Sequence, residues 1–117
     1  MDEVKLVRTI LRILQFLVGA QYAELATFAQ SDSLTPLQIE KAVETWPYPL
    51  VMPLGRRLQD LIYDEALEIA ATSPTQWSVY VNLWTRHEGR SDLTLEVTIY
   101  DCPGEYYGFR IDNIHVL

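Results

Sequence analysis

Residues 76–100 read QWSVYVNLWTRHEGRSDLTLEVTIY, and this stretch decides the fold. Two runs in it alternate between apolar and polar residues, which is the pattern of a β-strand with one buried face. Glu88-Gly89 lies between the runs and indicates a turn, so the two strands form an antiparallel hairpin. One hairpin face is purely apolar, and we expect it to be buried against other parts of the chain. Its members are Trp77, Val79, Val81 and Leu83 on the first strand and Leu93, Leu95, Val97 and Ile99 on the second.

The first 30 residues predict two helices. Residues 2–18 are apolar over most of a helix circumference and therefore predict a helix that is buried on most sides. A narrow polar stripe recurs at spacings of three and four residues, and its members are Lys5, Arg8, Arg12 and Gln15. Gly19 favours a break, and a second, shorter helix is expected over residues 22–30.

The third predicted helix has the most specific local signal in the chain. Thr35 is a suitable N-cap, Pro36 fits the first helical position, and Gln38 completes a T-x-x-Q capping box. We therefore expect the helix to begin at Pro36 and to end before Pro47, because the residue that precedes a proline is disfavoured in the α conformation. Its expected buried face comprises Ile39, Ala42, Val43 and Trp46.

The middle and the end of the sequence supply further elements. Residues 47–55 contain three prolines, so they predict an apolar loop or an edge segment and not a central strand. Residues 56–63 predict a short helix, whereas residues 64–72 fit both a helix and a strand, and we favour the strand. After a turn at residues 102–105, a last strand is expected from Tyr106. A bulge around Asp112-Asn113 would keep its apolar residues on one face.

Helices followed by antiparallel strands predict an α+β fold. In this fold, N-terminal helices pack on one face of a C-terminal antiparallel sheet of three or four strands. The chain has 117 residues, of which 49% are hydrophobic and 21% charged, and this suits one globular domain over residues 1–117. No internal repeat or low-complexity segment divides the sequence.

The charge balance argues against nucleic-acid binding. Sixteen Asp and Glu residues against nine Lys and Arg give a net charge of −7, which repels a phosphate backbone and would attract a basic protein partner. Cys102 is the only cysteine, so an internal disulfide and a cysteine metal cluster are both excluded, which fits a reducing compartment. Polar residues interrupt the apolar N-terminus, so we expect no membrane span, no signal peptide and a cytoplasmic protein.

Two resemblances add to this reading. The run WSVYVNLWTRHEGRSDLTLE (residues 77–96), followed by the terminal IDNIHVL (residues 111–117), resembles a family of small uncharacterised bacterial proteins. The resemblance covers roughly the C-terminal third of the chain and implies no established activity. The expected layout is also similar to the nuclear transport factor 2-like and cystatin-like folds, in which a curved sheet wraps a long helix. This second likeness concerns topology alone, so it implies no function.

Charged residues crowd the predicted hairpin connection, and they allow two interpretations. In the first, His87 is a general base or a ligand that Glu88 or Asp92 orients. In the second, the connection is a solvated turn whose charges pair weakly and keep the hairpin soluble. Arg86 and Arg90 belong to the same group of charges.

The second face of the hairpin carries the other candidate binding residues. The residues expected to converge there are Tyr80, Trp84, Glu96, Thr98, Tyr100 and Arg110. They would line a small-molecule pocket if the sheet curves, anchor a protein interface, or simply pair across strands to cover the sheet. For an interface between two copies of the chain, Tyr80 and Trp84 are the expected anchors.

The sequence lacks G-x-S-x-G, G-x-G-x-x-G and P-loop motifs. His87 and His115 lie far apart and give only a weak metal signal, so we expect no metal, no cofactor and no catalytic residue. We therefore predict a protein that acts by binding another protein, including a second copy of itself. One specific form is an immunity-type protein that neutralises a basic toxin. The alternative is a small-molecule-binding domain or an enzyme with Glu96 and His87 as acid–base candidates.

Replacing Thr35 with Ala should lower the free energy of unfolding by about 1 kcal/mol, because the first turn of the helix loses the side-chain acceptor for one of its N–H groups. Urea unfolding followed by circular dichroism measures this loss. A helix that runs unbroken through residues 30–40 would contradict the boundary on which the prediction depends.

Overall fold

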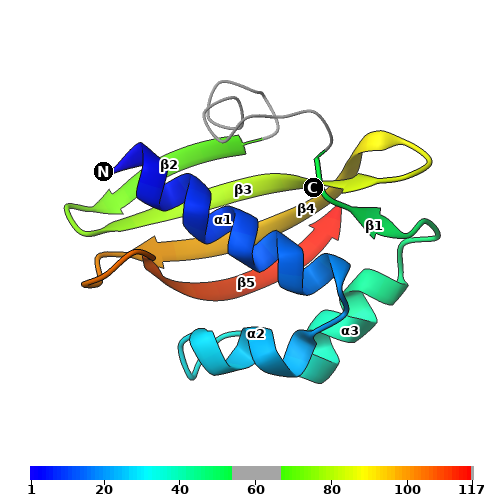
Figure 1. Ribbon diagram of the computed structural model, residues 1–117, viewed down its shortest axis with the longest axis horizontal. Helices are drawn as coiled ribbons and strands as arrows, with labels where there is room; N and C mark the ends of the chain where they lie inside the picture. The colour runs from blue at the N-terminus through cyan, green and yellow to red at the C-terminus, as the bar shows by residue number, and fades with distance from the viewer. Residues whose placement is uncertain (54–66, 117) are drawn as a thin grey trace.

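The computed structural model describes residues 1–53 and 67–116, and it has the α+β arrangement that the sequence predicts (Figure 1). Within these residues, three helices are followed by a five-stranded antiparallel sheet. The helices are α1 (Glu3–Val18), α2 (Tyr22–Phe28) and α3 (Pro36–Glu44). The strands are β1 (Leu50–Val51), β2 (Leu67–Ser73), β3 (Gln76–Thr85), β4 (Gly89–Tyr100) and β5 (Gly108–Val116).

The sheet is built around the hairpin of β3 and β4. Its strand order is β1-β3-β4-β5, and β2 pairs with β3 on the edge that β1 also occupies. β1 consists only of Leu50 and Val51, which pair with Thr85 and Trp84. This short strand raises the number of strands from the expected three or four to five. Its place at an edge agrees with the prolines around it, because proline cannot donate a ladder hydrogen bond.

The apolar face of the hairpin is buried, as predicted. Val79 pairs with Val97 and Val81 with Leu95, and each of these side chains is at most 4% exposed. α1 lies across this face of the sheet (Figure 1), and its buried side chains join those of the strands in one cluster. Removal of this apolar surface from water is the main favourable contribution to folding. The helix contributes Leu6, Ile10, Ile13, Leu14 and Leu17 to the cluster.

Two valines of α1 depart from the expectation that its apolar residues are buried. Val4 is 50% exposed and Val18 is 37% exposed. At about 100° per residue, both fall on the same side of the helix as Arg8 and Gln15, which are also exposed. The outward stripe of α1 is therefore partly apolar.

A bulge in β5 keeps its apolar residues on the core side. The register of the β4–β5 pair shifts between Glu96 and Val97, whose partners are Asn113 and Ile111. Asp112 is thus the extra residue, at the place that the sequence predicts. Because of this shift, the isoleucines on both sides of the bulge, at positions 111 and 114, remain buried.

A second register shift lies between Asn82 and Trp84 in the β3–β4 pair. At this irregular point, side chains form hydrogen bonds with backbone groups of the two strands. The Ser91 hydroxyl donates to the Leu83 carbonyl at 2.7 Å and accepts the N–H of Leu93 at 3.2 Å. The Asn82 amide donates to the Ser91 carbonyl at 3.1 Å. Backbone groups that the interrupted ladder leaves over are therefore satisfied.

The predicted capping box is present at the start of α3. The N–H of Gln38 donates to Oγ1 of Thr35 at 3.2 Å, and the N–H of Thr35 donates to Oε1 of Gln38 at 2.9 Å. The helix begins at Pro36, as expected, and it ends at Glu44, before Pro47. Two of its first N–H groups thereby gain partners without help from the rest of the fold.

Other boundaries differ from the sequence prediction for identifiable reasons. α2 ends at Phe28 and not at residue 30, because Gln30 donates its N–H to β5. β5 begins at Gly108 and not at Tyr106, because the N–H of Tyr107 donates to the Thr9 side chain at 2.9 Å. The strand predicted over 64–72 is confirmed from residue 67 onward. The helix predicted over 56–63 lies outside the described residues.

The loop between α2 and α3 covers the outer edge of β5. The N–H of Gln30 donates to the Phe109 carbonyl at 2.9 Å, and the N–H of Leu34 donates to the Ile111 carbonyl at 3.0 Å. In the other direction, the N–H of Ile111 donates to Oγ of Ser33 at 2.9 Å. These bonds occupy backbone groups that an edge strand would otherwise expose, so this part of β5 is closed to pairing with a further strand.

Replacing Val81 with Ala should lower the free energy of unfolding by about 2–3 kcal/mol, through lost burial and the cavity that remains. Val116, on β5, is 53% exposed and provides the matched control, whose change to Ala should cost under about 0.5 kcal/mol. Urea unfolding of both variants measures the difference. Equal losses would contradict the difference in burial between the centre of the sheet and the end of β5.

Candidate functional site

Six of the candidate residues from the sequence, four from the second face of the hairpin and two from its connection, fall in three separate places. Three lie on the sheet face opposite α1, two at the hairpin end and one beside β1. In that order they are Tyr80, Glu96 and Arg110; His87 and Arg90; and Trp84. The structure therefore brings together only the first group on one patch of the sheet.

Glu96 is at the centre of this first group. It lies opposite Tyr80 on β3 and opposite Asn113 on β5. Its Oε2 contacts Nε2 of His115, and the contact is an ion pair when the imidazole is protonated. The Glu96 side chain is 23% exposed and that of His115 is 38% exposed. Sequence reasoning did not join these two residues, because their contact depends on the register that the β5 bulge sets.

Arg110 is held by two carboxylates and a hydroxyl. Its Nε donates to Asp112 at 2.7 Å, and its two terminal nitrogens donate to Asp32 at 3.1 Å and to Thr98 at 3.2 Å. The hydrogen bond to Asp112, and then the one to Asp32, raise the pKa of Arg110 above its ordinary value. The Thr98 hydroxyl donates in turn to Asp112 at 2.7 Å. Arg110 therefore links β4, β5 and the loop before α3, and its donors are largely taken up by this role.

The hairpin end docks on the loop that precedes β1. The ring of His87 stacks on Tyr48, with 4.4 Å between the ring centroids and 13° between the planes. Oε1 of Glu88 accepts a hydrogen bond from the Trp46 indole at 2.8 Å and from the Thr85 hydroxyl at 3.2 Å. The turn residues are exposed, which agrees with the solvated-turn interpretation. The contacts of His87 and Glu88 in addition attach the hairpin end to the proline-containing loop, which neither interpretation included.

The described residues do not assemble the acid–base or metal groups considered from the sequence. His87 lies in the hairpin connection, whereas Glu96 lies seven residues along β4 from Gly89, roughly 20 Å at the rise of a strand. Within residues 1–53 and 67–116, no three His, Cys, Asp or Glu side chains are grouped so that they could hold a metal ion. No helix in this part of the chain combines the length and the apolar character needed to cross a membrane.

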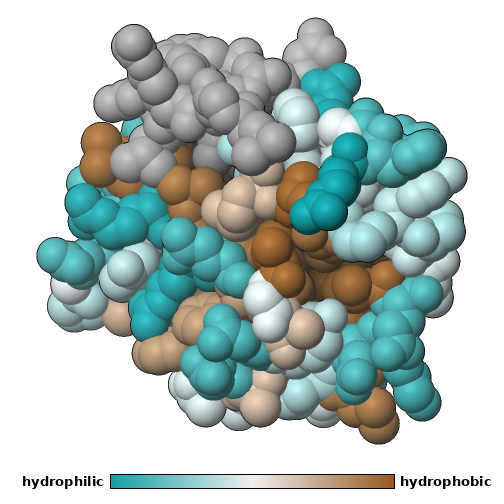
Figure 2. All heavy atoms as spheres, turned by 45° about the vertical axis from the view of Figure 1, so that its right-hand side comes forward, coloured by the Kyte–Doolittle hydropathy of each residue, from teal (hydrophilic) through white to brown (hydrophobic). Residues whose placement is uncertain are grey.

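A groove opens between the C-terminal end of α1 and β1. Figure 2 shows a hollow with hydrophobic walls and hydrophilic borders on the side of the molecule where α1 ends. The groove and the open solvent at its mouth together take up about 200 Å³. Its described lining is wholly apolar and comprises Leu14, Leu17, Val18, Leu50, Val51, Pro53, Leu83 and Trp84.

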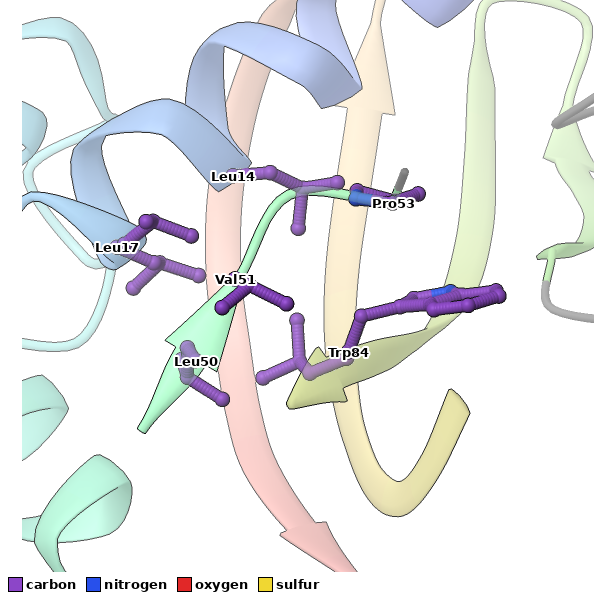
Figure 3. A pocket seen from close by; sticks show the side chains of 8 residues that line it. Leu14, Leu17, Leu50, Val51, Pro53 and Trp84 are labelled. Carbon is purple, nitrogen blue, oxygen red and sulfur yellow. The ribbon is translucent and has the colours of Figure 1, made fainter. Parts of the chain in front are cut away.

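The groove exists because the elements around it are short. α1 stops at Val18, with Gly19 as its C-cap, and β1 extends over two residues only. In Figure 3, Leu17 of α1 and Trp84 of β3 lie on opposite sides of Val51, which projects between them. The helix, the edge strand and the central strand therefore each supply one wall.

Trp84 owes its position to the turn of the hairpin. It pairs with Val51 on one side and with Arg90 on the other. A side chain at Gly89 would begin 3.6 Å from the Trp84 ring, so the ring lies against this glycine. Gly89 has a φ of 72°, a conformation that favours glycine. Gly89 therefore forms the turn and also leaves room for the Trp84 ring, which lines the groove.

The chemistry of the groove is that of binding. None of the lining side chains that the structure describes is ionisable, so they provide no proton donor or acceptor for catalysis and no metal ligand. An apolar lining favours an apolar occupant. Of the lining residues, only Trp84 is a candidate binding residue in the sequence analysis. The sequence signal for the groove was the apolar, proline-containing stretch 47–55, but a sequence pattern does not identify the residues on which such a stretch packs.

Comparisons with known proteins give one family. Residues 14–117 match the family described as a domain of unknown function (DUF7668). This range includes the whole described lining of the groove, and it extends well beyond the C-terminal third on which the resemblance rested. Comparisons with curated proteins and with solved structures found no match. The likeness to nuclear transport factor 2-like and cystatin-like folds, and the bacterial origin, therefore stay predictions.

Replacing Thr85 with Val should lower the free energy of unfolding by about 1 kcal/mol. Thr85 is 1% exposed, and its hydroxyl donates to the Glu88 carboxylate and accepts the Glu88 N–H at 3.0 Å. Valine keeps the shape and removes both hydrogen bonds. Urea unfolding measures the loss, and unchanged stability would assign the docking of the hairpin end to the Tyr48–His87 stack and the Trp46–Glu88 hydrogen bond.

Proposed function

The chain belongs to the DUF7668 family, and we propose that it acts by binding another protein, which inserts an apolar side chain into the groove between α1 and β1. The observation that carries the proposal is the lining of the groove, which is apolar, open to solvent and without an ionisable side chain among its described members. Apolar surface bordered by polar residues is typical of interaction sites on soluble proteins.

The chemistry of the groove favours a protein side chain over a small molecule. Small-molecule pockets contain a few polar groups that orient the ligand. The described lining of the groove offers no charged group for this purpose. Trp84 belongs to the residue types that are enriched among interface anchors. A Leu, Ile or Phe side chain of a partner fits this chemistry.

The charge of the chain supports a basic partner. Its net charge is −7. Four basic side chains are already engaged within the molecule by carbonyls, aromatic rings or carboxylates, namely Lys5, Arg8, Arg12 and Arg110. The excess of carboxylates in the net charge would raise the association rate of a basic protein. An immunity-type protein that meets a basic toxin is one specific form of this proposal, and it rests on charge alone.

Two exposed valines of α1 provide a matched test. Val18 lines the groove and Val4 lies at the other end of the helix, away from it. Selection of a random peptide display library against the unmodified chain should enrich peptides that combine a Leu, Ile or Phe with Lys or Arg. Val18→Gln should weaken the selected peptides about tenfold, or about 1.4 kcal/mol, because it places an amide in the apolar groove. Val4→Gln should change their affinity less than about twofold.

Fluorescence anisotropy of labelled peptides measures both affinities. Glutamine leaves the net charge at −7, so the comparison isolates the apolar contact from the attraction of basic residues. Equal weakening by both variants would contradict a role of the groove. Enriched peptides without basic residues would contradict the basic partner while leaving the groove as the binding site.

A further inference from the structure

The two edges of the sheet differ in how their backbone groups are satisfied. On β5, the loop between α2 and α3 takes up outward groups of Phe109 and Ile111. β2 lies at the opposite edge (Figure 1), and within residues 1–53 and 67–116 it pairs with β3 alone. Alternate residues of β2 therefore direct N–H and C=O groups outward, which is the arrangement that pairs with a further strand.

The sequence of β2 contains few of the features that protect an edge strand. It reads LEIAATS, without Lys, Arg or Pro, and Glu68 is its single charge. A bulge at Thr72, next to the turn, leaves residues 67–71 as a regular stretch. Within that stretch Ile69 is partly buried and Ala70 is exposed. Small and uncharged residues along an edge leave room for the backbone of another strand.

We propose that β2 pairs with β2 of a second copy of this chain, in antiparallel orientation and with the two-fold axis at Ile69. Such a pairing joins the two sheets into one and satisfies the outward backbone groups of both copies. Ile69 pairs with Val79 of β3, so it lies on the face that α1 covers. There it meets its own counterpart, and a pair of β-branched side chains is favourable across two strands.

The position of the charge on β2 agrees with this register. With the axis at Ile69, Glu68 of each copy lies opposite Ala70 of the other, so the two carboxylates do not face each other. Like charges directly opposite would be destabilising. The net charge of −7 on each chain opposes association. Salt screens this repulsion, with a Debye length of about 10 Å at 0.1 M, so the affinity of the dimer should rise as salt is added. The pairing does not depend on the groove or on its occupant.

Sedimentation of the full chain tests the pairing. The unmodified protein should be a dimer at high micromolar concentration, with a dissociation constant that falls as NaCl is added. Ala70→Glu places a carboxylate opposite Glu68 in both halves of the pairing and should raise the dissociation constant about tenfold or more. Ala23→Glu is the matched control, since Ala23 is an exposed alanine of α2 and the net charge changes equally. It should change the dissociation constant less than about twofold.

A charge reversal tests the register itself. Glu68→Lys, added to Ala70→Glu, places opposite charges face to face and should restore the dimer. Hydrogen exchange of the unmodified chain gives an independent readout, because the outward amides of β2 should become protected as the protein concentration rises. Circular dichroism of each variant should match that of the unmodified chain.

Two results would overturn the proposal. The first is a monomer at every concentration and salt. The second is a dimer that Ala70→Glu leaves unchanged. If Tyr80→Arg weakens that dimer, self-association belongs to the sheet face opposite α1.

Discussion

The packing of α1 on one face of the sheet is the interaction on which the other features depend. The central strands have one purely apolar face, and α1 is the described element that lies across it (Figure 1). This cover leaves polar side chains to the opposite face, where Glu96 and Arg110 find partners on neighbouring strands or loops. α2 and α3 then lie beside β5, and the loop between them occupies its edge.

The groove and the uncovered edge both arise where this packing stops. α1 ends at Val18, and β1 contributes only two residues, so the apolar side chains between them line an open groove in the part of the chain that the structure describes. At the margin of the sheet, β2 has a partner on one side only among the described residues. At the groove apolar surface is incompletely buried, and at the β2 edge backbone groups have no strand partner within residues 1–53 and 67–116. These are the two costs that association with another chain removes.

Local sequence patterns predicted the fold well. They predicted less of the site, because the site depends on contacts between segments that are distant in sequence. Alternation in the hairpin predicted the buried face, because one register joins residues 76–82 to residues 94–100, and the capping box at Thr35 involves only neighbours in sequence. The prolines around β1 excluded a central strand but did not reveal its pairing with β3. The same limit explains why Trp84 was identified without its groove. The other walls come from α1 and β1, and the stacking of His87 on Tyr48 likewise joins distant segments.

The order of synthesis gives α1 a particular difficulty. Its start is held by the connection between β4 and β5, since the N–H of Asp2 donates to the Tyr107 hydroxyl and Lys5 donates to the Cys102 carbonyl. These contacts span 105 and 97 positions of the sequence. A growing chain therefore lacks the complete partner surface of α1 until β5 has left the ribosome, and folding dominated by such distant contacts is slow. During that interval the apolar side of the first helix stays exposed on the nascent chain, where it can associate with other unfolded chains.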